Sequence, residues 1–105
     1  RRVVCERIRR EVSSEFQIRA SDAVACALWA ICTNWNEPEE AVIAAVSYGG
    51  DTDTVAAMTG ALAGARHGTA WIPDRWYLNL ENGPEGRDDI ISAAVELALL
   101  PLPDA

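Results

Sequence analysis

The sequence contains no lysine, so all nine of its basic residues are arginines. Histidine, methionine and phenylalanine each occur only once among the 105 residues. No apolar run approaches the roughly 20 residues that a membrane-spanning helix requires, so we expect no membrane insertion. Alternation of apolar and polar residues with a period of two is nearly absent, which argues against half-buried β-strands. These absences leave a small helical chain as the expected class.

Acidic residues outnumber arginines, and the formal net charge is −7. Most of the arginines lie in the first third of the chain, whereas most of the acidic residues follow it. Because nucleic-acid binding depends on neutralising phosphates, the acidic body argues against a nucleic-acid partner. The early arginines are expected to form the hydrated face of an amphipathic helix.

The length of 105 residues accommodates one domain at most. The sequence opens with Arg1-Arg2 rather than with methionine and an apolar leader, which indicates a fragment or a processed piece. The three cysteines form no CxxC pair, so no structural zinc site is expected. This use of cysteine favours a reducing, cytoplasmic compartment.

The hydrophobic pattern predicts helices that are joined by short loops. The segment 22–33 is apolar almost all round, which is typical of a buried helix. Asn36 is predicted to cap the next helix, which ends at the glycine pair 49–50. The predicted helices cover residues 1–12, 22–33, about 37–48, 52–67 and 88–100, with a short one after Pro73.

Glycine recurs at every fourth position along the predicted helix 52–67 and at its end, at Gly60, Gly64 and Gly68. Each interior glycine costs a helix about 1 kcal/mol relative to alanine. We therefore expect a compensating close approach of a neighbouring helix.

Two carboxylates and a hydroxyl follow the double glycine in the string GGDTDT, residues 49–54. Capping of the helix N-terminus is one interpretation, because Asp and Thr satisfy its unpaired N–H groups. A cation site is the other, because Asp51 and Asp53 can both point beyond the helix end into a cleft. Such hard oxygen ligands suit Mg²⁺, Mn²⁺ or Ca²⁺. Tyr48, directly before the glycines, could line the same cleft.

Two other motifs share part of this string. An EF-hand loop fails, because Val55, Ala56 and Leu62 stand where it needs ligands and a glycine. The aspartyl phosphatase signature DxDx[TV] matches residues 51–55, but that signature follows a buried strand, and residues 41–46 are predicted to be helical. The lack of lysine also removes the usual phosphate-binding cation of that family, so this remains a minor alternative.

The segment GGDTDTVAAMTGALAGARHG, residues 49–68, resembles the C-terminal signature of the ADP-ribosylglycohydrolases, the family of dinitrogenase reductase-activating glycohydrolase-like proteins. The flanking segments ALW (27–29), EEAVIAAV (39–46) and IPDRW (72–76) agree with it and follow in the family's order. The resemblance covers roughly residues 17–82.

This resemblance implies an all-α, orthogonal multi-helix fold, of which residues 1–105 form the C-terminal segment of a single domain. It implies a dinuclear Mg²⁺ or Mn²⁺ site in which Asp51, Asp53 and Thr54 are ligands, with Asp53 as the bridging one. Asp51 and Asp53 would then act in catalysis through the bound metals. The implied reaction removes ADP-ribose from a modified protein side chain or a small acceptor.

Members of the family are much longer, and their remaining ligands, a Thr-Asp-Asp cluster and an upstream Glu, are not found in this sequence. We therefore expect half of the metal site and no activity from the chain alone. We also expect an exposed apolar face that self-associates or contacts the missing N-terminal part. A non-catalytic structural or binding relative, like the crystallin members of the family, is the main alternative.

The remaining candidates have ordinary structural explanations. His67, the only histidine, lies at a predicted helix end, where a cation complements the helix dipole. The acidic pair Asp88-Asp89 opens the last predicted helix and is expected to cap it. Packing is the expected role of all four tryptophans, and Trp29 is expected in the core. For the three near loops, Trp35, Trp71 and Trp76, stacking on an adenine is the alternative.

Overall fold

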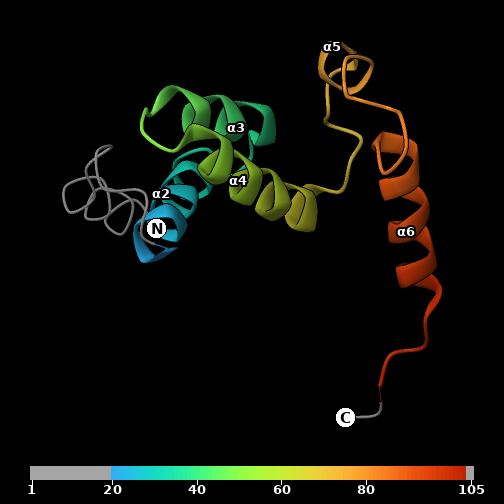
Figure 1. Cartoon of the computed structure of the whole chain (residues 1–105). Helices are drawn as coiled ribbons and strands as arrows, with labels where there is room; N and C mark the ends of the chain where they lie inside the picture. The colour runs from blue at the N-terminus through green and yellow to red at the C-terminus, as the bar shows by residue number, and fades with distance from the viewer. Residues whose placement is uncertain (1–19, 104–105) are drawn as a thin grey trace. The chain divides into compact units, whose positions relative to one another are not determined.

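The structure is a computed structural model that describes residues 20–103 (Figure 1). The helices are α2 (Ala20–Thr33), α3 (Pro38–Ser47), α4 (Thr52–His67), α5 (Asp74–Tyr77) and α6 (Arg87–Leu99). No strand occurs in this part of the chain, so the all-α prediction is confirmed. The helix predicted over residues 1–12 lies outside the described residues. None of the helices in the described part is both long and apolar enough to span a membrane.

The chain divides into two compact units after Ile72. The first unit contains α2, α3 and α4, and the second contains α5 and α6. The acidic string 49–54 lies in the first unit, so the packing of α2, α3 and α4 determines the geometry of the candidate site.

Helices α2, α3 and α4 pack on one another around a core of small side chains (Figure 1). One buried cluster, here called the alanine cluster, consists of Ala23, Cys26, Ala30, Ala45 and Val55. A second buried cluster consists of Ile31, Ala41 and Ala63, and the half-buried rings of Trp35 and Trp71 pack against it. The packing role expected for these two tryptophans is therefore confirmed.

Helix α2 is apolar all round but is buried on one side only. Its buried residues include Cys26 and Ala30, whereas Val24 and Leu28 are 45% and 40% exposed. The full burial expected for this helix is not reached within the described residues, because α3 and α4 cover only one of its faces. The other side is the exposed apolar face that the sequence predicts.

Helix α3 begins differently from the prediction. Its N-cap is Glu37, and Pro38 lies in the first turn. The Oδ1 atom of Asn36 instead accepts a hydrogen bond from Nη2 of Arg66 (3.3 Å). Nε of Arg66 donates to the carbonyl oxygen of Trp35 (3.1 Å), and its guanidinium lies 3.8 Å from the centroid of that ring. The prediction of Asn36 as a cap is wrong, because the last turn of α4 engages its side chain.

Helix α4 has the bounds that the sequence predicts. Gly68 ends it with a φ of 73°, and the N–H of Gly68 donates to the carbonyl oxygen of Gly64 (2.8 Å). The interior glycines are not explained by packing within this part of the chain. A Cβ atom built on Gly60 or Gly64 meets nothing within 4 Å. The close approach of a helix that we expected at these glycines is therefore not found among residues 20–103.

In the second unit, the loop before α6 is bound to the first turn of that helix. The side chains of Asn82 and Asp88 are joined by a hydrogen bond from Nδ2 to Oδ2 (2.9 Å), and the N–H of Asp88 donates to Oδ1 of Asn82 (2.9 Å). The N–H of Glu85 donates to Oδ2 of Asp89 (2.7 Å). The hydrogen bond from Asn82 lowers the pKa of the Asp88 carboxyl below its usual value. The N-cap is Gly86, so the acidic pair holds the loop instead of capping the helix.

Candidate metal centre

The candidate site lies where the chain turns from α3 into α4. Tyr48 is the C-cap of α3, and Gly49 and Gly50 follow it with φ angles of 91° and 79°. Glycine adopts such positive φ angles at little cost, whereas residues with a Cβ atom are strained there. The double glycine therefore allows the chain to reverse directly before the acidic residues.

Asp51 lies at the centre of a tight turn. Its φ and ψ angles are −78° and 69°, and the N–H of Thr52 donates to the carbonyl oxygen of Gly50 (2.9 Å), which is the geometry of an inverse γ-turn. Asp51 is the N-cap of α4, and its carbonyl oxygen accepts from the N–H of Val55 (3.1 Å). Its carboxylate makes no capping hydrogen bond to the helix. Because the turn replaces the extended backbone typical of a capping residue, this side chain remains available for another role.

Asp53 lies on the exposed first turn of α4. Its Oδ1 atom accepts a hydrogen bond from the N–H of Thr54 (2.9 Å). A side-chain hydrogen bond with Asp51, followed by the bond from Thr54, lowers the pKa of the Asp53 carboxyl below its usual value. The two carboxyl groups therefore lie side by side at the helix end. Asp53 partly fulfils the capping interpretation, because it satisfies one N–H group of the first turn, whereas Asp51 does not.

These residues fit a hard divalent cation as part of a larger ligand set. Two adjacent carboxylates and the hydroxyl of Thr54 are the oxygen ligands that Mg²⁺ and Mn²⁺ prefer. Within the described residues, no group of three or more His, Cys, Asp or Glu side chains is placed to hold an ion. Since Mg²⁺ takes about six ligands, Asp51, Asp53 and Thr54 would supply about half of them.

The only histidine lies at the other end of α4. His67 is in the last turn of this 16-residue helix. Since each residue advances the chain by about 1.5 Å along the helix axis, His67 lies far from Asp51. Its Nε2 atom is 3.0 Å from the carbonyl oxygen of Trp35. A carbonyl oxygen is an acceptor only, so this nitrogen carries a proton and is not available as a metal ligand. His67 thus lies in the last turn of α4, as the sequence predicts, and contacts the turn that precedes α3.

Two aromatic residues near the site form a pair that sequence reasoning missed. The rings of Trp29 in α2 and Tyr48 have centroids 5.1 Å apart and planes inclined at 55°. The sequence suggests each residue separately, Trp29 in the core and Tyr48 near the cleft. No spacing rule joins them, because their contact depends on how α2 packs against the end of α3.

The aspartyl phosphatase alternative lacks its structural context. Residues 41–46, where that motif requires a buried strand before the acidic residues, belong to helix α3. The fold therefore does not support this minor alternative.

Comparison with known proteins places the acidic string in a family. The sequence model of the ADP-ribosylglycohydrolase family matches residues 2–104. ADP-ribosylhydrolase ARH3 of Mus musculus is 40% identical over 55 residues, which are 52% of this chain and 15% of that relative. ARH3 of Danio rerio is 40% identical over 63 residues, 60% of this chain and 17% of the relative. ADP-ribosylarginine hydrolase Tri1 of Pseudomonas putida (strain GB-1) is 40% identical over 67 residues, 60% of this chain and 18% of the relative.

No solved structure matches the chain. The aligned part of the chain spans less than a fifth of each of these relatives. The family match, in contrast, covers nearly the whole chain, including the GGDTDT string and both compact units. It confirms the resemblance carried by residues 49–68. The chain belongs to the ADP-ribosylglycohydrolase family.

Proposed function

We propose that this chain supplies part of a divalent-metal site to an enzyme that hydrolyses the bond between ADP-ribose and an acceptor. Family membership supports the reaction class, as do the names of the relatives, which describe an ADP-ribosylhydrolase and an ADP-ribosylarginine hydrolase. The observation on which the proposal depends is the state of the Asp51 side chain. Its carboxylate lies at an N-cap position, makes no capping hydrogen bond and is held beside Asp53.

In the proposed site Asp51, Asp53 and Thr54 would hold Mg²⁺ or Mn²⁺ as part of a dinuclear centre, with Asp53 as the ligand common to both ions. Such cations, when bound, would supply Lewis-acid chemistry for hydrolysis of the bond to ADP-ribose. The residues themselves contribute charge and position. Both residues lie at the N-terminus of α4, where the helix dipole favours negative charge.

The proposed substrate is an ADP-ribosylated protein side chain or a small ADP-ribosylated acceptor. The remaining metal ligands come from another part of a longer polypeptide, so the isolated 105-residue chain is inactive in this proposal. We also propose a cytoplasmic location, which the odd number of cysteines and the lack of a CxxC pair support.

The test is Asp53→Asn in the full-length protein. Asparagine keeps the size of the side chain and is as good a cap as aspartate, but it removes the charge that two cations would share. We expect the affinity for Mn²⁺ and the rate of ADP-ribose release to fall by orders of magnitude. Calorimetric titration with Mn²⁺ and an ADP-ribose release assay measure the two effects.

Asp22→Asn is the matched control, because Asp22 also lies in the first turn of a helix, α2, away from the glycine turn. It should leave Mn²⁺ affinity unchanged. If the Asp53→Asn protein binds Mn²⁺ as tightly as wild type does, then Asp53 serves only at the helix end and is not a metal ligand. A wild-type protein that binds no metal and releases no ADP-ribose would favour the non-catalytic, crystallin-like alternative.

A further inference from the structure

Within the turn around Asp51, few interactions fix the backbone conformation. Gly49 and Gly50 have no side chains, and glycine is the residue with the widest choice of backbone conformations. One hydrogen bond, from the N–H of Thr52 to the carbonyl oxygen of Gly50, closes the turn. The position of the Asp51 backbone therefore depends on the residues that flank the turn, while its carboxyl group also interacts with Asp53.

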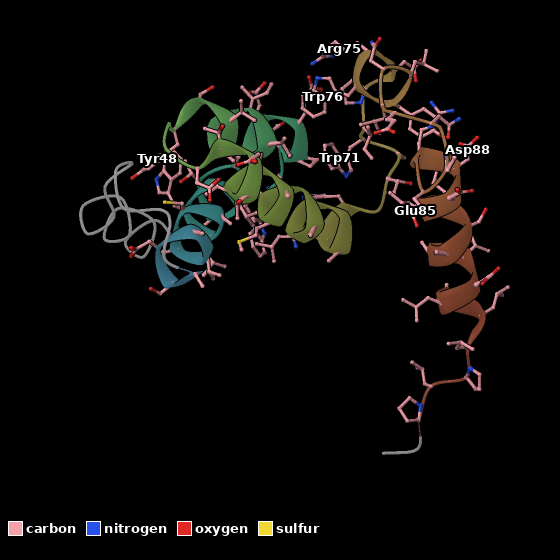
Figure 2. All side chains as sticks on the ribbon, in the orientation of Figure 1. Tyr48, Trp71, Arg75, Trp76, Glu85 and Asp88 are labelled. Carbon is pink, nitrogen blue, oxygen red and sulfur yellow. The ribbon has the colours of Figure 1, made fainter. Side chains whose placement is uncertain are left out.

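Both flanks of the turn rest on the alanine cluster. Val55 is a fully buried member of this cluster, and its N–H binds the carbonyl oxygen of Asp51. On the other side, the half-buried ring of Tyr48 packs against the same cluster, at the end of α3 (Figure 2). The half-buried ring of Trp29 also packs there. The cluster thus connects the residues before and after Asp51.

The contact between Trp29 and Tyr48 also links helix α2 to the residues that flank the turn. Their centroid separation of 5.1 Å and inclination of 55° lie in the range that aromatic pairs favour. The buried members of the cluster are alanines, a cysteine and a valine, so these two rings are much the largest side chains packed on it. The pair therefore contributes to the packing of α2 against the C-terminus of α3, where the glycine turn begins.

We propose that Tyr48, through its ring contact with Trp29, is a positioning residue for Asp51 and thereby sets the metal affinity of the site. This inference rests on the proposed metal-binding function. Groups that hydrogen-bond to metal ligands without touching the ion typically change affinity by about 10- to 100-fold when they are removed, and for a residue that acts through packing we expect the lower end of this range. The proposal concerns the ring of Tyr48, because the contact with Trp29 is between the two ring systems.

The experiment compares Mn²⁺ affinities of full-length variants by calorimetry, together with their unfolding midpoints in urea. Tyr48→Ala should weaken Mn²⁺ binding about tenfold. Tyr48→Phe, which restores the ring, should bind within about twofold of wild type. Met58→Ala is the matched control, because Met58 packs against the same cluster but does not flank the turn. This control should lower the unfolding midpoint and leave Mn²⁺ affinity unchanged.

Each result decides between distinct outcomes. Wild-type affinity in Tyr48→Ala, or an equal loss of affinity in Met58→Ala, would overturn the positioning role. A wild-type protein without Mn²⁺ affinity would overturn the proposed function instead. If Tyr48→Ala does not fold, Tyr48→Leu keeps apolar bulk without the ring, and it must bind Mn²⁺ several-fold more weakly than Tyr48→Phe for the proposal to stand.

Discussion

At the scale of single residues, the backbone directly before α4 differs from the backbone at an ordinary capped helix N-terminus. Gly49 and Gly50 both have positive φ angles, and Asp51 forms an inverse γ-turn. A capping aspartate would instead adopt an extended backbone and accept a hydrogen bond from the first turn. Asp53 takes part of that role through the N–H of Thr54. The two carboxylates of the string thus have different structural roles although they are two residues apart.

Gly50→Ala tests this backbone directly. An L-residue at a φ of 79° costs about 1–2 kcal/mol, so we expect the free energy of unfolding to fall by about that amount. Relief of the strain also shifts the turn, so Mn²⁺ affinity of the full-length protein should fall. Urea unfolding and calorimetry measure the two effects. Gly83→Ala is the control, because a Cβ atom there meets nothing within 4 Å; equal stability losses in both variants would contradict a strained turn.

At the scale of the helix, the outward face of α4 beyond its first turn carries no charge. From residue 57 to residue 65 its exposed or half-buried positions are alanine or glycine: Ala57, Gly60, Ala61, Gly64 and Ala65. A helix at the surface of a globular protein normally presents polar residues to water. Next to this face, α2 and α4 border an apolar groove of about 370 Å³, lined by Val24, Ala27, Leu28, Met58, Ala61 and Leu62. The composition of α4 is that of a helix with neighbours on more than one side.

Gly60→Ala should therefore have opposite effects in two settings. In the 105-residue chain a Cβ atom at Gly60 meets open space, so alanine should stabilise the helix by about 1 kcal/mol. In the full-length protein the same change should destabilise, if another helix packs closely on this face. Urea unfolding of both proteins measures the difference. Stabilisation in both would show that the face remains open and that the glycines have no packing role.

At the scale of the whole molecule, much apolar surface is exposed. Helix α6 has no buried residue, although it contains Ile90, Val95 and Leu97. In the first unit, Val24 and Leu28 are exposed beside the groove. Exposed apolar surface of this kind, on each unit by itself, is typical of an interface with another element or another chain.

We expect the isolated chain to self-associate, and sedimentation velocity at several concentrations measures this. Leu28→Glu should shift the chain toward monomer, because it places a charge in the groove. Val46→Glu is the control: Val46 is 52% exposed on α3 and does not line the groove. A wild-type chain that sediments as a monomer and unfolds in one cooperative step would contradict this expectation.

The isolated chain should also release no ADP-ribose in the presence of Mg²⁺ or Mn²⁺, because it provides only about half of the oxygen ligands that such an ion needs. Incubation with an ADP-ribosylated protein, followed by quantification of free ADP-ribose, tests this. The full-length protein is the positive control, and release above a sample without protein would show that residues 1–105 contain a complete site.

The sequence by itself determined the features that depend on local chemistry. The helical class, the start of α4 at Thr52 and its end at Gly68 follow from hydrophobic periodicity and from the backbone freedom of glycine, which act within one or two turns. The GGDTDT string likewise identified the family and the candidate ligands, because these residues are adjacent in the chain.

Only the tertiary structure decided how distant segments use these residues. Asn36 binds Arg66 instead of capping α3, and Tyr48 meets Trp29 beside the glycine turn at residues 49–50. Gly60 faces open space although its spacing predicts a close helix. None of these outcomes is encoded in a local pattern, because each depends on which side chains two helices bring together when they pack. Packing between helices is set by the shapes of whole faces, and a linear spacing rule does not contain that information.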